Sequence, residues 1–220
     1  MLFKQLRVLH DREPASAAMN MAIDQALLEE ATLPLLRFYG WRNPALSFGY
    51  FGRFAEASRE AGDRELVRRW TGGGSVPHGD DLTYSLVIPT GTPAAGAAPR
   101  VIYAALHTAI REALTEEGIF AELAAAAGAK VSEACFSNPV IDDLLLNGRK
   151  IAGAAQRRTR GGFLHQGSIQ LPNLAPSFSD RFARFLGAEI EQVNYSASLI
   201  KRAATLTAER YSREDWQRRW

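Results

Sequence analysis

Apolar side chains recur at helical spacing in several parts of the chain. The first such stretch covers residues 14–32, where the apolar positions share one side and most acidic positions lie elsewhere. A second runs through residues 102–114 and stops at Gly118, and two more follow Ser177. Because recurrence every three or four residues puts side chains on one face, these stretches predict amphipathic helices. A shorter helix is expected over residues 54–62.

Runs rich in aromatic and β-branched residues separate these helices. Two of them, residues 35–41 and 45–51, are joined by Arg42-Asn43-Pro44. They predict either a hairpin or two consecutive strands. Further strands are expected at residues 65–70, 82–89 and 163–171.

Asn147-Gly148 is a turn signal between two apolar runs, residues 144–146 and 151–152. Both of its residues tolerate the positive φ of a type I′ turn, so a β-hairpin is predicted. Lys150 opens the second arm and is one of four lysines in a chain that otherwise carries its positive charge on arginine. Its ammonium is placed either to meet a carboxyl or phosphate group or to face solvent.

The order of these elements is a helix, several strands, a helix, a hairpin and a strand, and then helices. Without internal repeats or long linkers, this order predicts an α+β fold with a mixed, mostly antiparallel sheet flanked by helices. At 220 residues, the chain fits one large domain with one core.

The composition excludes several classes of protein. With no apolar run long enough for a bilayer and no signal-peptide pattern, a cytoplasmic protein is expected. A net charge of +2 is too small to indicate nucleic-acid binding. The single cysteine, Cys135, excludes an internal disulfide framework and a Cys-rich zinc site, and is either buried filler or a nucleophile. A local basic cluster faces an anionic partner or water and comprises Arg149, Lys150, Arg157, Arg158 and Arg160.

Three consecutive glycines stand at residues 72–74. Such a run is kept where φ is unusual or where something must approach the backbone closely, as phosphate or acyl carbonyl oxygens do. It matches neither a P-loop nor a dinucleotide fingerprint, so a structural turn remains an equal alternative. His78 follows with Asp80 and Asp81, but this set lacks a third nitrogen or sulfur ligand, and no metal site is predicted.

Four segments of the chain carry a resemblance to a known family. They are NMAIDQALL, LRFYGWRNPALSFGY, RRWTGGGSVPHGDDLTYS and NGRKIAGAAQRRTRGGFLHQGSI, in family order. Together they resemble the biotin/lipoate A/B protein ligase family, which includes lipoate-protein ligases and octanoyl transferases. The resemblance implies a single catalytic domain over residues 1–220 without a C-terminal accessory domain. It also implies an enzyme that attaches an octanoyl or lipoyl group to a specific lysine of a lipoyl carrier protein.

The resemblance also implies roles for individual residues. In the family, a lysine at the position of Lys150 touches the acyl carbonyl, and a glycine-rich loop lines the acyl or acyl-adenylate pocket. An ammonium polarises that carbonyl, and backbone N–H groups hold the oxyanion. Basic residues would dock the carrier, because such carriers are commonly acidic; these are Arg157, Arg158 and Arg160. The implied acyl- or adenylate-binding residues are Arg68, Arg69, Gly72, Gly73, Gly74, Ser75, Val76, His78, Gly153 and Ala154.

The branches of the family differ in how they activate the acyl group. One transferase branch moves octanoate from an acyl carrier protein onto a cysteine thioester and then onto the carrier, without a cofactor. Cys135 resembles that nucleophile in local sequence and in its distance from Lys150. The ligases use ATP and Mg to form an acyl adenylate, and the triple glycine resembles theirs, since the transferase branch usually has arginine where Gly74 stands.

The ligases generally rely on an additional C-terminal accessory domain or a separate subunit, and no such domain is expected in this chain. Together with Cys135, this expectation outweighs the triple glycine and leans toward octanoyl transfer through a Cys135 thioester. The implied partners are an acyl carrier protein and a lipoyl carrier, either the H protein or a dehydrogenase E2 lipoyl domain. An ATP-dependent lipoate-protein ligase, or its catalytic half, remains the alternative. A non-catalytic protein that binds a lipoyl carrier is a minor alternative, and biotin transfer fits the last segment less well.

Overall fold

The computed structural model describes residues 1–128 and 138–219. Its strands are β1 (Phe3–His10), β2 (Leu35–Tyr39), β3 (Ala45–Phe48), β4 (Glu65–Arg68), β5 (Val76–His78), β6 (Leu82–Pro89), β7 (Glu122–Leu123), β8 (Leu144–Leu146), β9 (Arg149–Thr159), β10 (Gly162–Ile169) and β11 (Gly187–Gln192). Its α-helices are α1 (Ala17–Glu30), α2 (Phe54–Ala61), α3 (Pro99–Thr115), α4 (Phe178–Leu186), α5 (Ala197–Leu206) and α6 (Glu214–Gln217). A 3₁₀ turn, η1 (Pro93–Gly96), and a π-helical turn, η3 (Thr207–Tyr211), complete the elements.

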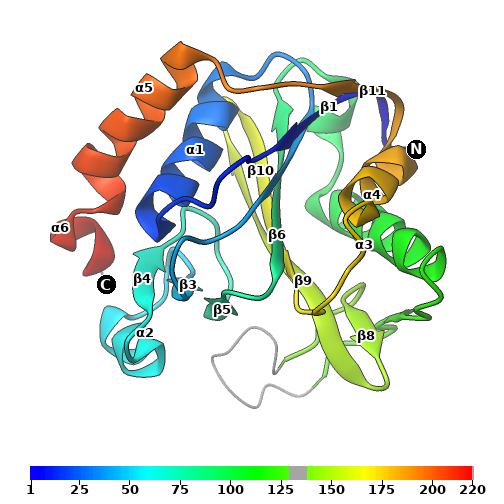
Figure 1. The fold of residues 1–220 in the computed structure, drawn as a ribbon, viewed down its shortest axis with the longest axis horizontal. Coiled ribbons are helices and arrows are strands. Elements are labelled where there is room, and N and C mark those ends of the chain that lie inside the picture. Colours follow the sequence, from blue (N-terminus) through cyan, green and yellow to red (C-terminus); the bar gives the residue numbers. More distant parts are fainter. Residues whose placement is uncertain (129–137, 220) are drawn as a thin grey trace.

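Among these described residues, eight strands form one large sheet in the order β11-β1-β2-β6-β10-β9-β8-β7. β1 pairs in parallel with β11 and β2, and every other neighbouring pair in this sheet is antiparallel. The predicted fold is therefore confirmed as α+β, with a mixed, mostly antiparallel sheet flanked by helices (Figure 1).

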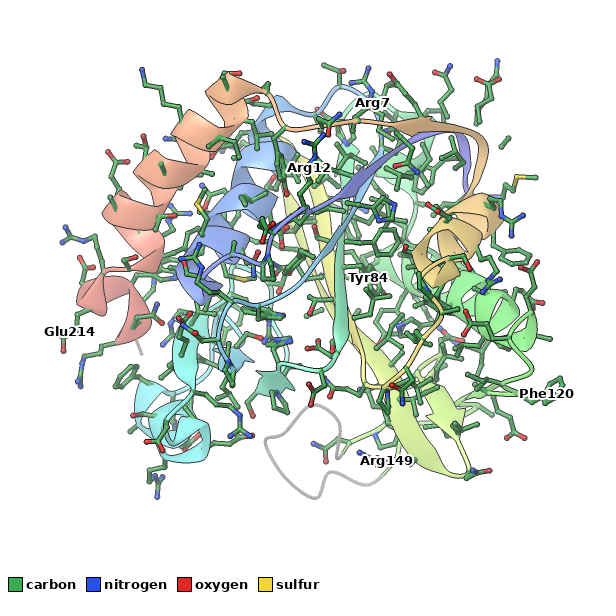
Figure 2. All side chains as sticks on the ribbon, viewed as in Figure 1. Arg7, Arg12, Tyr84, Phe120, Arg149 and Glu214 are labelled. Atoms are coloured by element: carbon green, nitrogen blue, oxygen red, sulfur yellow. The ribbon has the colours of Figure 1, made fainter. Side chains whose placement is uncertain are left out.

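Helices cover both faces of the large sheet. α1 and α5 lie on one face and α3 and α4 on the other (Figure 1). Tyr84 lies in the interior of the molecule beside β6 (Figure 2). On the α4 face, its ring meets Phe182 edge to face, with 5.1 Å between ring centroids. Burial of apolar side chains in these two layers provides most of the driving force for folding. Along the described residues, no helix combines the length and apolar character needed to cross a bilayer.

A smaller sheet, in the order β4-β3-β5, stands with α2 at one end of the large sheet (Figure 1). The sequence left open whether residues 35–41 and 45–51 form a hairpin or two consecutive strands. The structure shows the second arrangement, because β2 joins the large sheet and β3 joins the small one. The short link between them thus connects the two sheets.

The predicted hairpin at Asn147-Gly148 is confirmed. β8 and β9 pair in antiparallel fashion on either side of the dipeptide. Asn147 has a φ of 52° and Gly148 a φ of 76°, as a type I′ turn requires. The turn places Lys150 at the start of the longest strand.

β1 and β11 are among the strands that were not predicted from the sequence. β1 and β11 pair with each other in parallel, although β1 begins the chain and β11 lies near its other end. β11 reads GAEIEQ and is largely exposed, so it lacks the alternation of apolar and polar residues that marks a half-buried strand. Its pairing with β1 is a tertiary effect that a local pattern does not contain.

Candidate active site

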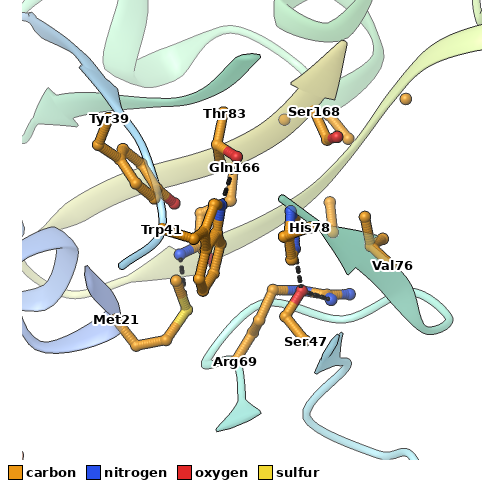
Figure 3. Close-up of a pocket in the computed structure, with 14 residues that line it drawn as sticks. Met21, Tyr39, Trp41, Ser47, Arg69, Val76, His78, Thr83, Gln166 and Ser168 are labelled. Carbon is orange, nitrogen blue, oxygen red and sulfur yellow. Dashed lines mark hydrogen bonds between the residues drawn. The ribbon is translucent and has the colours of Figure 1, made fainter. Parts of the chain in front are cut away.

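A pocket opens where β9 and β10 of the large sheet meet the small sheet (Figure 3). The hollow encloses about 360 Å³ when the solvent-filled space at its open mouth is included. Its lining residues are Met21, Tyr39, Trp41, Ser47, Arg69, Val76, His78, Thr83, Gly153, Ala154, Ala155, Gln166, Gly167 and Ser168.

Small side chains form a row across three strands at this pocket. Gly153 on β9 is paired with Ser168 on β10, and Ser168 is paired with Thr83 on β6. Neighbouring strands are about 4.8 Å apart, so the row from Gly153 to Thr83 is about 10 Å long. The sequence therefore provides an elongated slot that runs across the strands.

Aromatic side chains close the Thr83 end of this slot. The Trp41 and His78 rings stack with centroids 4.1 Å apart, as Figure 3 shows. Trp41 is fixed there because its indole N–H donates to the Thr83 hydroxyl at 2.7 Å. Tyr39 packs against Trp41 at 5.9 Å, and Met21 from α1 completes the wall. This end of the pocket is apolar and bounded by side chains held in place.

His78 is held on both sides by hydrogen bonds. Its Nε2 lies 2.6 Å from Ser47 Oγ, and its Nδ1 lies 2.8 Å from Asp81 Oδ2. Burial lowers the pKa of His78 despite the opposing effect of Asp81, so the ring is neutral at pH 7. Burial would raise the pKa of Asp81, but His78 and the Ser168 and Thr83 hydroxyls outweigh it and lower that pKa. The cluster therefore braces the pocket wall with a neutral ring and an ionised carboxylate.

The buried carboxylate of Asp24, on α1, holds side chains at the pocket in place through hydrogen bonds. Its side chain is fully buried and accepts hydrogen bonds from Arg37 at 2.8 Å, Ser85 at 2.7 Å and Gln166 at 2.6 Å. The sequence pattern assigned the acidic positions of this helix to its polar side. Asp24 is instead inside because the cationic Arg37, also fully buried, lies beside it. The pair ties α1 to the strands that form the pocket.

Lys150 lies at the opposite end of the slot from Trp41. A Cβ added at Gly153 would come within 2.4 Å of Lys150 Cε and 2.7 Å of its Nζ, so only glycine leaves room for the ammonium. Nζ lies 2.8 Å from Asp143 Oδ2, and the lysine side chain is 2% exposed. Lys150 is therefore a buried cation with a fixed position beside the pocket, and a solvent-facing lysine is excluded.

The glycine run packs against the same strand. Arg69 donates from Nη2 to the carbonyl oxygens of Gly72 at 3.0 Å and Gly74 at 2.8 Å. A Cβ at Gly73 would lie 3.3 Å from the Cβ of Ala155. Ala155 and Gly153 are two residues apart on β9, which corresponds to about 6.7 Å along a strand. The glycine run and the Lys150 ammonium thus approach β9 at adjacent positions on one side.

The close approach of the glycine run depends on Gly49, at the end of β3. A Cβ at Gly49 would lie 2.0 Å from the carbonyl oxygen of Gly73, a distance at which the loop would have to move. Gly73, Gly74 and Ser75 line a second hollow rather than the pocket itself. Ser75 donates there to Glu60 at 2.5 Å.

The structure brings together half of the binding residues that the resemblance implied. The five that line the pocket are Arg69, Val76, His78, Gly153 and Ala154. Arg68 lies elsewhere: its guanidinium is buried and donates to the backbone carbonyls of Tyr50 at 2.6 Å and Gln217 at 2.8 Å. It anchors α6 against the loop after β3. The Gly72 carbonyl accepts a hydrogen bond from Arg69, which lines the pocket.

The basic residues on and after β9 differ in their surroundings. Arg157 donates to the Trp70 carbonyl at 3.0 Å and covers the Tyr50 ring at 4.7 Å. Arg158 donates to the Ala97 carbonyl at 2.6 Å. Arg160 is exposed in the turn that follows β9.

Cys135 lies outside the described residues, so the structure gives no position for the candidate nucleophile. Among residues 1–128 and 138–219, no group of three or more His, Cys, Asp and Glu side chains is arranged to hold a metal ion.

Several pocket residues were not singled out in the sequence. Trp41 and Ser47 lie in the second of the four family-like segments, Thr83 in the third, and Gln166 and Ser168 in the last. Because they lie in segments that resemble the family, these residues could have been chosen as candidate pocket residues from the sequence. Asp143 and Tyr103 lie outside the four segments, and no local pattern pointed to them.

Comparisons with known proteins identify the family of this chain. The family model described as "Lipoyl protein ligase A/B catalytic domain" matches residues 16–216. An octanoyltransferase LipM from Oceanobacillus iheyensis is 35% identical over 217 residues, which cover 94% of this chain and 79% of that protein. LipM from Bacillus subtilis is 37% identical over 73% of this chain and 63% of its own length. LipM from Moorella thermoacetica is 40% identical over 69% of this chain and 60% of its own length.

Solved structures share the fold. A bi-partite lipoate protein ligase from Thermoplasma acidophilum superposes with a TM-score of 0.74 at 18% identity, over 99% of this chain and 96% of that one. A lipoate-protein ligase A bound with ATP superposes with a TM-score of 0.71 at 21% identity, over 99% and 98%. At these identities, the likeness concerns the fold.

Proposed function

This chain belongs to the lipoyl protein ligase A/B catalytic domain family, and we propose that it is an octanoyltransferase of protein lipoylation. In this proposal, residues 1–220 form one catalytic domain, of which the family model matches residues 16–216. The enzyme takes an octanoyl group from an acyl carrier protein and attaches it to a specific lysine of a lipoyl carrier protein. The LipM relatives, at 35% to 40% identity, support this activity.

The single observation that carries the proposal is the slot between Lys150 and Trp41. Aromatic rings bound it at one end, and Gly153 lines it at the other end, with the buried Lys150 ammonium packed beside that glycine. An eight-carbon chain gains about 0.8 kcal/mol for each methylene group that it buries in such a slot. Its carbonyl then lies beside Gly153, within reach of the Lys150 ammonium.

The proposed reaction has two steps. The Cys135 thiolate attacks the thioester carbonyl of the donor, the donor's carbon–sulfur bond breaks, and the acyl carrier protein leaves as a thiolate that takes a proton from water. The neutral amine of the carrier lysine then attacks the octanoyl thioester, the bond to the cysteine sulfur breaks, the cysteine leaves as thiolate, and the amine's extra proton passes to water. Lys150 stabilises the negative charge that develops on the carbonyl oxygen in both steps. Neither step needs a cofactor.

We propose acyl-binding roles for the pocket residues Arg69, Val76, His78, Gly153 and Ala154. Arg69 acts by holding the glycine run, Gly72 to Gly74, against the pocket strand. Ser75 belongs to the hollow beside that run and Arg68 to the anchor of α6, so we assign neither to direct acyl contact.

The experiment that tests the function is an intact-mass measurement after incubation with octanoyl acyl carrier protein. We expect the wild-type protein to gain one octanoyl group and Cys135→Ala to gain none. A subsequent incubation with H protein or an E2 lipoyl domain is expected to move the group onto the carrier. A wild-type protein that never forms the adduct, while the donor remains intact, contradicts the cysteine route.

An ATP-dependent lipoate ligase is the second candidate function, and the triple glycine is the feature that favours it. The hollow beside that run is lined by Glu56, Glu60 and Arg53, and Arg53 pairs with Glu56 at 3.4 Å. These residues offer no net positive charge to a triphosphate, so they do not fit ATP. Carrier modification that requires ATP and Mg, and that persists in Cys135→Ser, would establish the ligase instead.

We further propose that Arg157, Arg158 and Arg160 help to dock an acidic carrier. They lie on and just after β9, the strand that also holds Lys150 and Gly153. A carrier bound near them would therefore be close to the pocket mouth. Arg160, which is exposed, is the residue through which this contact is most readily made.

Trp41→Ala is expected to change the preferred length of the acyl chain. Removing the indole opens the closed end of the slot, so two further methylene groups gain about 1.6 kcal/mol, roughly a 15-fold shift in favour of decanoyl over octanoyl. The measurement is competition between octanoyl and decanoyl donors, read by intact mass.

Trp216→Ala is the matched control for this prediction. Trp216 is as buried as Trp41, at 7% exposure, but lies outside the pocket. We expect it to lower stability without changing the ratio of the two products. Unchanged selectivity in Trp41→Ala would show that the indole does not bound the acyl chain.

A further inference from the structure

The carboxylate that holds Lys150 is itself held by Tyr103 of α3. Asp143 is fully buried and accepts from three donors: Lys150 Nζ at 2.8 Å, the Val140 N–H at 2.7 Å, and the Tyr103 hydroxyl. A buried carboxylate with this many donors has one favourable position. The position of the ammonium therefore depends on contacts that lie outside the pocket.

The Tyr103 hydroxyl makes a second contact that leads back to the pocket. It accepts a hydrogen bond from the Ala154 N–H at 3.2 Å, and Ala154 lines the pocket beside Gly153. One hydroxyl thus connects the pocket strand to the carboxylate that orients the lysine. Burial and the Asp143 carboxylate raise the pKa of Tyr103 far above its usual value, so the hydroxyl keeps its proton and donates.

His107, one turn after Tyr103 on α3, contacts Asp142, the residue before Asp143. His107 Nδ1 lies 2.5 Å from the carbonyl oxygen of Asp142, and the Tyr103 and His107 rings meet edge to face at 4.2 Å. Asp142 has a φ of 70°, a conformation that a non-glycine residue keeps only where its surroundings fix it. Two residues one turn apart on α3 therefore determine the path of residues 142–143.

We propose that Tyr103 is a positioning residue for acyl transfer: its hydroxyl, itself anchored by the Ala154 N–H, fixes Asp143 and thereby holds the Lys150 ammonium over Gly153. This inference rests on the proposed function, in which Lys150 acts on the acyl carbonyl. Tyr103 touches no substrate itself. It acts through Asp143, so its effect should disappear when Asp143 no longer carries a charge.

Tyr103→Phe tests the proposal, because it removes only the hydroxyl. We expect kcat for octanoyl loading to fall about 10- to 100-fold, the size expected for loss of a hydrogen bond to a charged group, with KM for the donor nearly unchanged. Tyr211→Phe is the matched control, since that hydroxyl is also buried and donates to Gln25 at 2.8 Å, away from the pocket. Both variants are expected to lose similar stability, and only the first to lose rate. Equal rates in Tyr103→Phe and wild type would overturn the proposal.

A double variant separates positioning from a general structural role. If Tyr103 acts through Asp143, the variant Tyr103→Phe/Asp143→Asn should be no slower than Asp143→Asn alone. Losses that multiply would show that Tyr103 acts independently, which contradicts the proposal.

A second readout does not require the octanoyl reaction. Limited labelling with acetic anhydride, analysed by peptide mass, compares Lys150 with the reference lysines Lys4 and Lys201 in the same molecule. Tyr103→Phe is expected to raise the relative labelling of Lys150 several-fold, because its ion pair with Asp143 is loosened. A wild-type protein that transfers no octanoyl group would refute the proposed function, whereas unchanged Lys150 labelling in Tyr103→Phe would refute the positioning role.

Discussion

Replacing Lys150 with alanine is expected to slow octanoyl transfer to the carrier by about 10²- to 10³-fold, the range found when one oxyanion donor is removed. The reason is the location of the ammonium, which is buried, held by Asp143 and placed over Gly153 at the pocket wall. A positive charge in such a place stabilises developing negative charge more than a hydrated one, because little water screens it. Single-turnover rates from a preformed octanoyl enzyme measure this step directly.

The control for this prediction must account for the carboxylate left behind. Lys150→Ala leaves Asp143 buried without its cation, which costs about 3–5 kcal/mol of stability. The double variant Lys150→Met/Asp143→Asn removes both charges and should restore much of the stability but none of the rate. Lys201→Ala, at an exposed position of α5, should change neither. A double variant with normal transfer rates would exclude Lys150 from the chemistry.

Lowering the pH is expected to reduce the stability of the fold already at pH values well above those at which carboxylates titrate. Burial lowers the pKa of His107 to about 4, and it also lowers the pKa values of His78 and His165. In the unfolded chain, each of these histidines has a pKa of about 6.5, as histidine does in short peptides. Between these values the unfolded chain binds more protons than the folded one, so stability is complete above about pH 6.5 and falls as the pH decreases.

The size of the effect follows from the same shifts. Each histidine contributes up to about 1.4 kcal/mol per pH unit, and His107 alone contributes about 3 kcal/mol by pH 4. Urea unfolding at pH 7.5, 6.5, 5.5 and 5 measures the loss. His107→Gln should flatten the dependence. Equal stability at pH 7.5 and 5 would contradict the prediction.

The parts of the fold that depend on short-range chemistry were predictable. The spacing of apolar residues located α1 and α3, and Asn147-Gly148 located the β8–β9 turn, because each signal comes from residues close together in the chain. The pairing of β1 with β11 was not predictable in this way. It depends on a match between segments far apart, and β11 has no apolar alternation of its own.

The same distinction between local sequence signals and tertiary packing applies to the residues of the site. The family-like segments indicated Lys150, Gly153 and the glycine run, all of which meet at β9. They did not distinguish Arg68 from its neighbour Arg69, although one anchors α6 and the other borders the pocket. Adjacent residues on an extended chain point in opposite directions, and which direction faces the pocket is decided by packing. Tyr103 was missed because its role exists only once α3 lies against β9.

The pairing of β1 with both β2 and β11 affects how the protein is made on the ribosome. β1 is synthesised before β11, so one of its two edges stays unpaired until β11 has left the exit tunnel. Exposed strand edges favour association with other chains, and contacts between distant segments form slowly. During most of its synthesis, the nascent chain therefore presents an open edge, and we expect general chaperones to protect it at that stage.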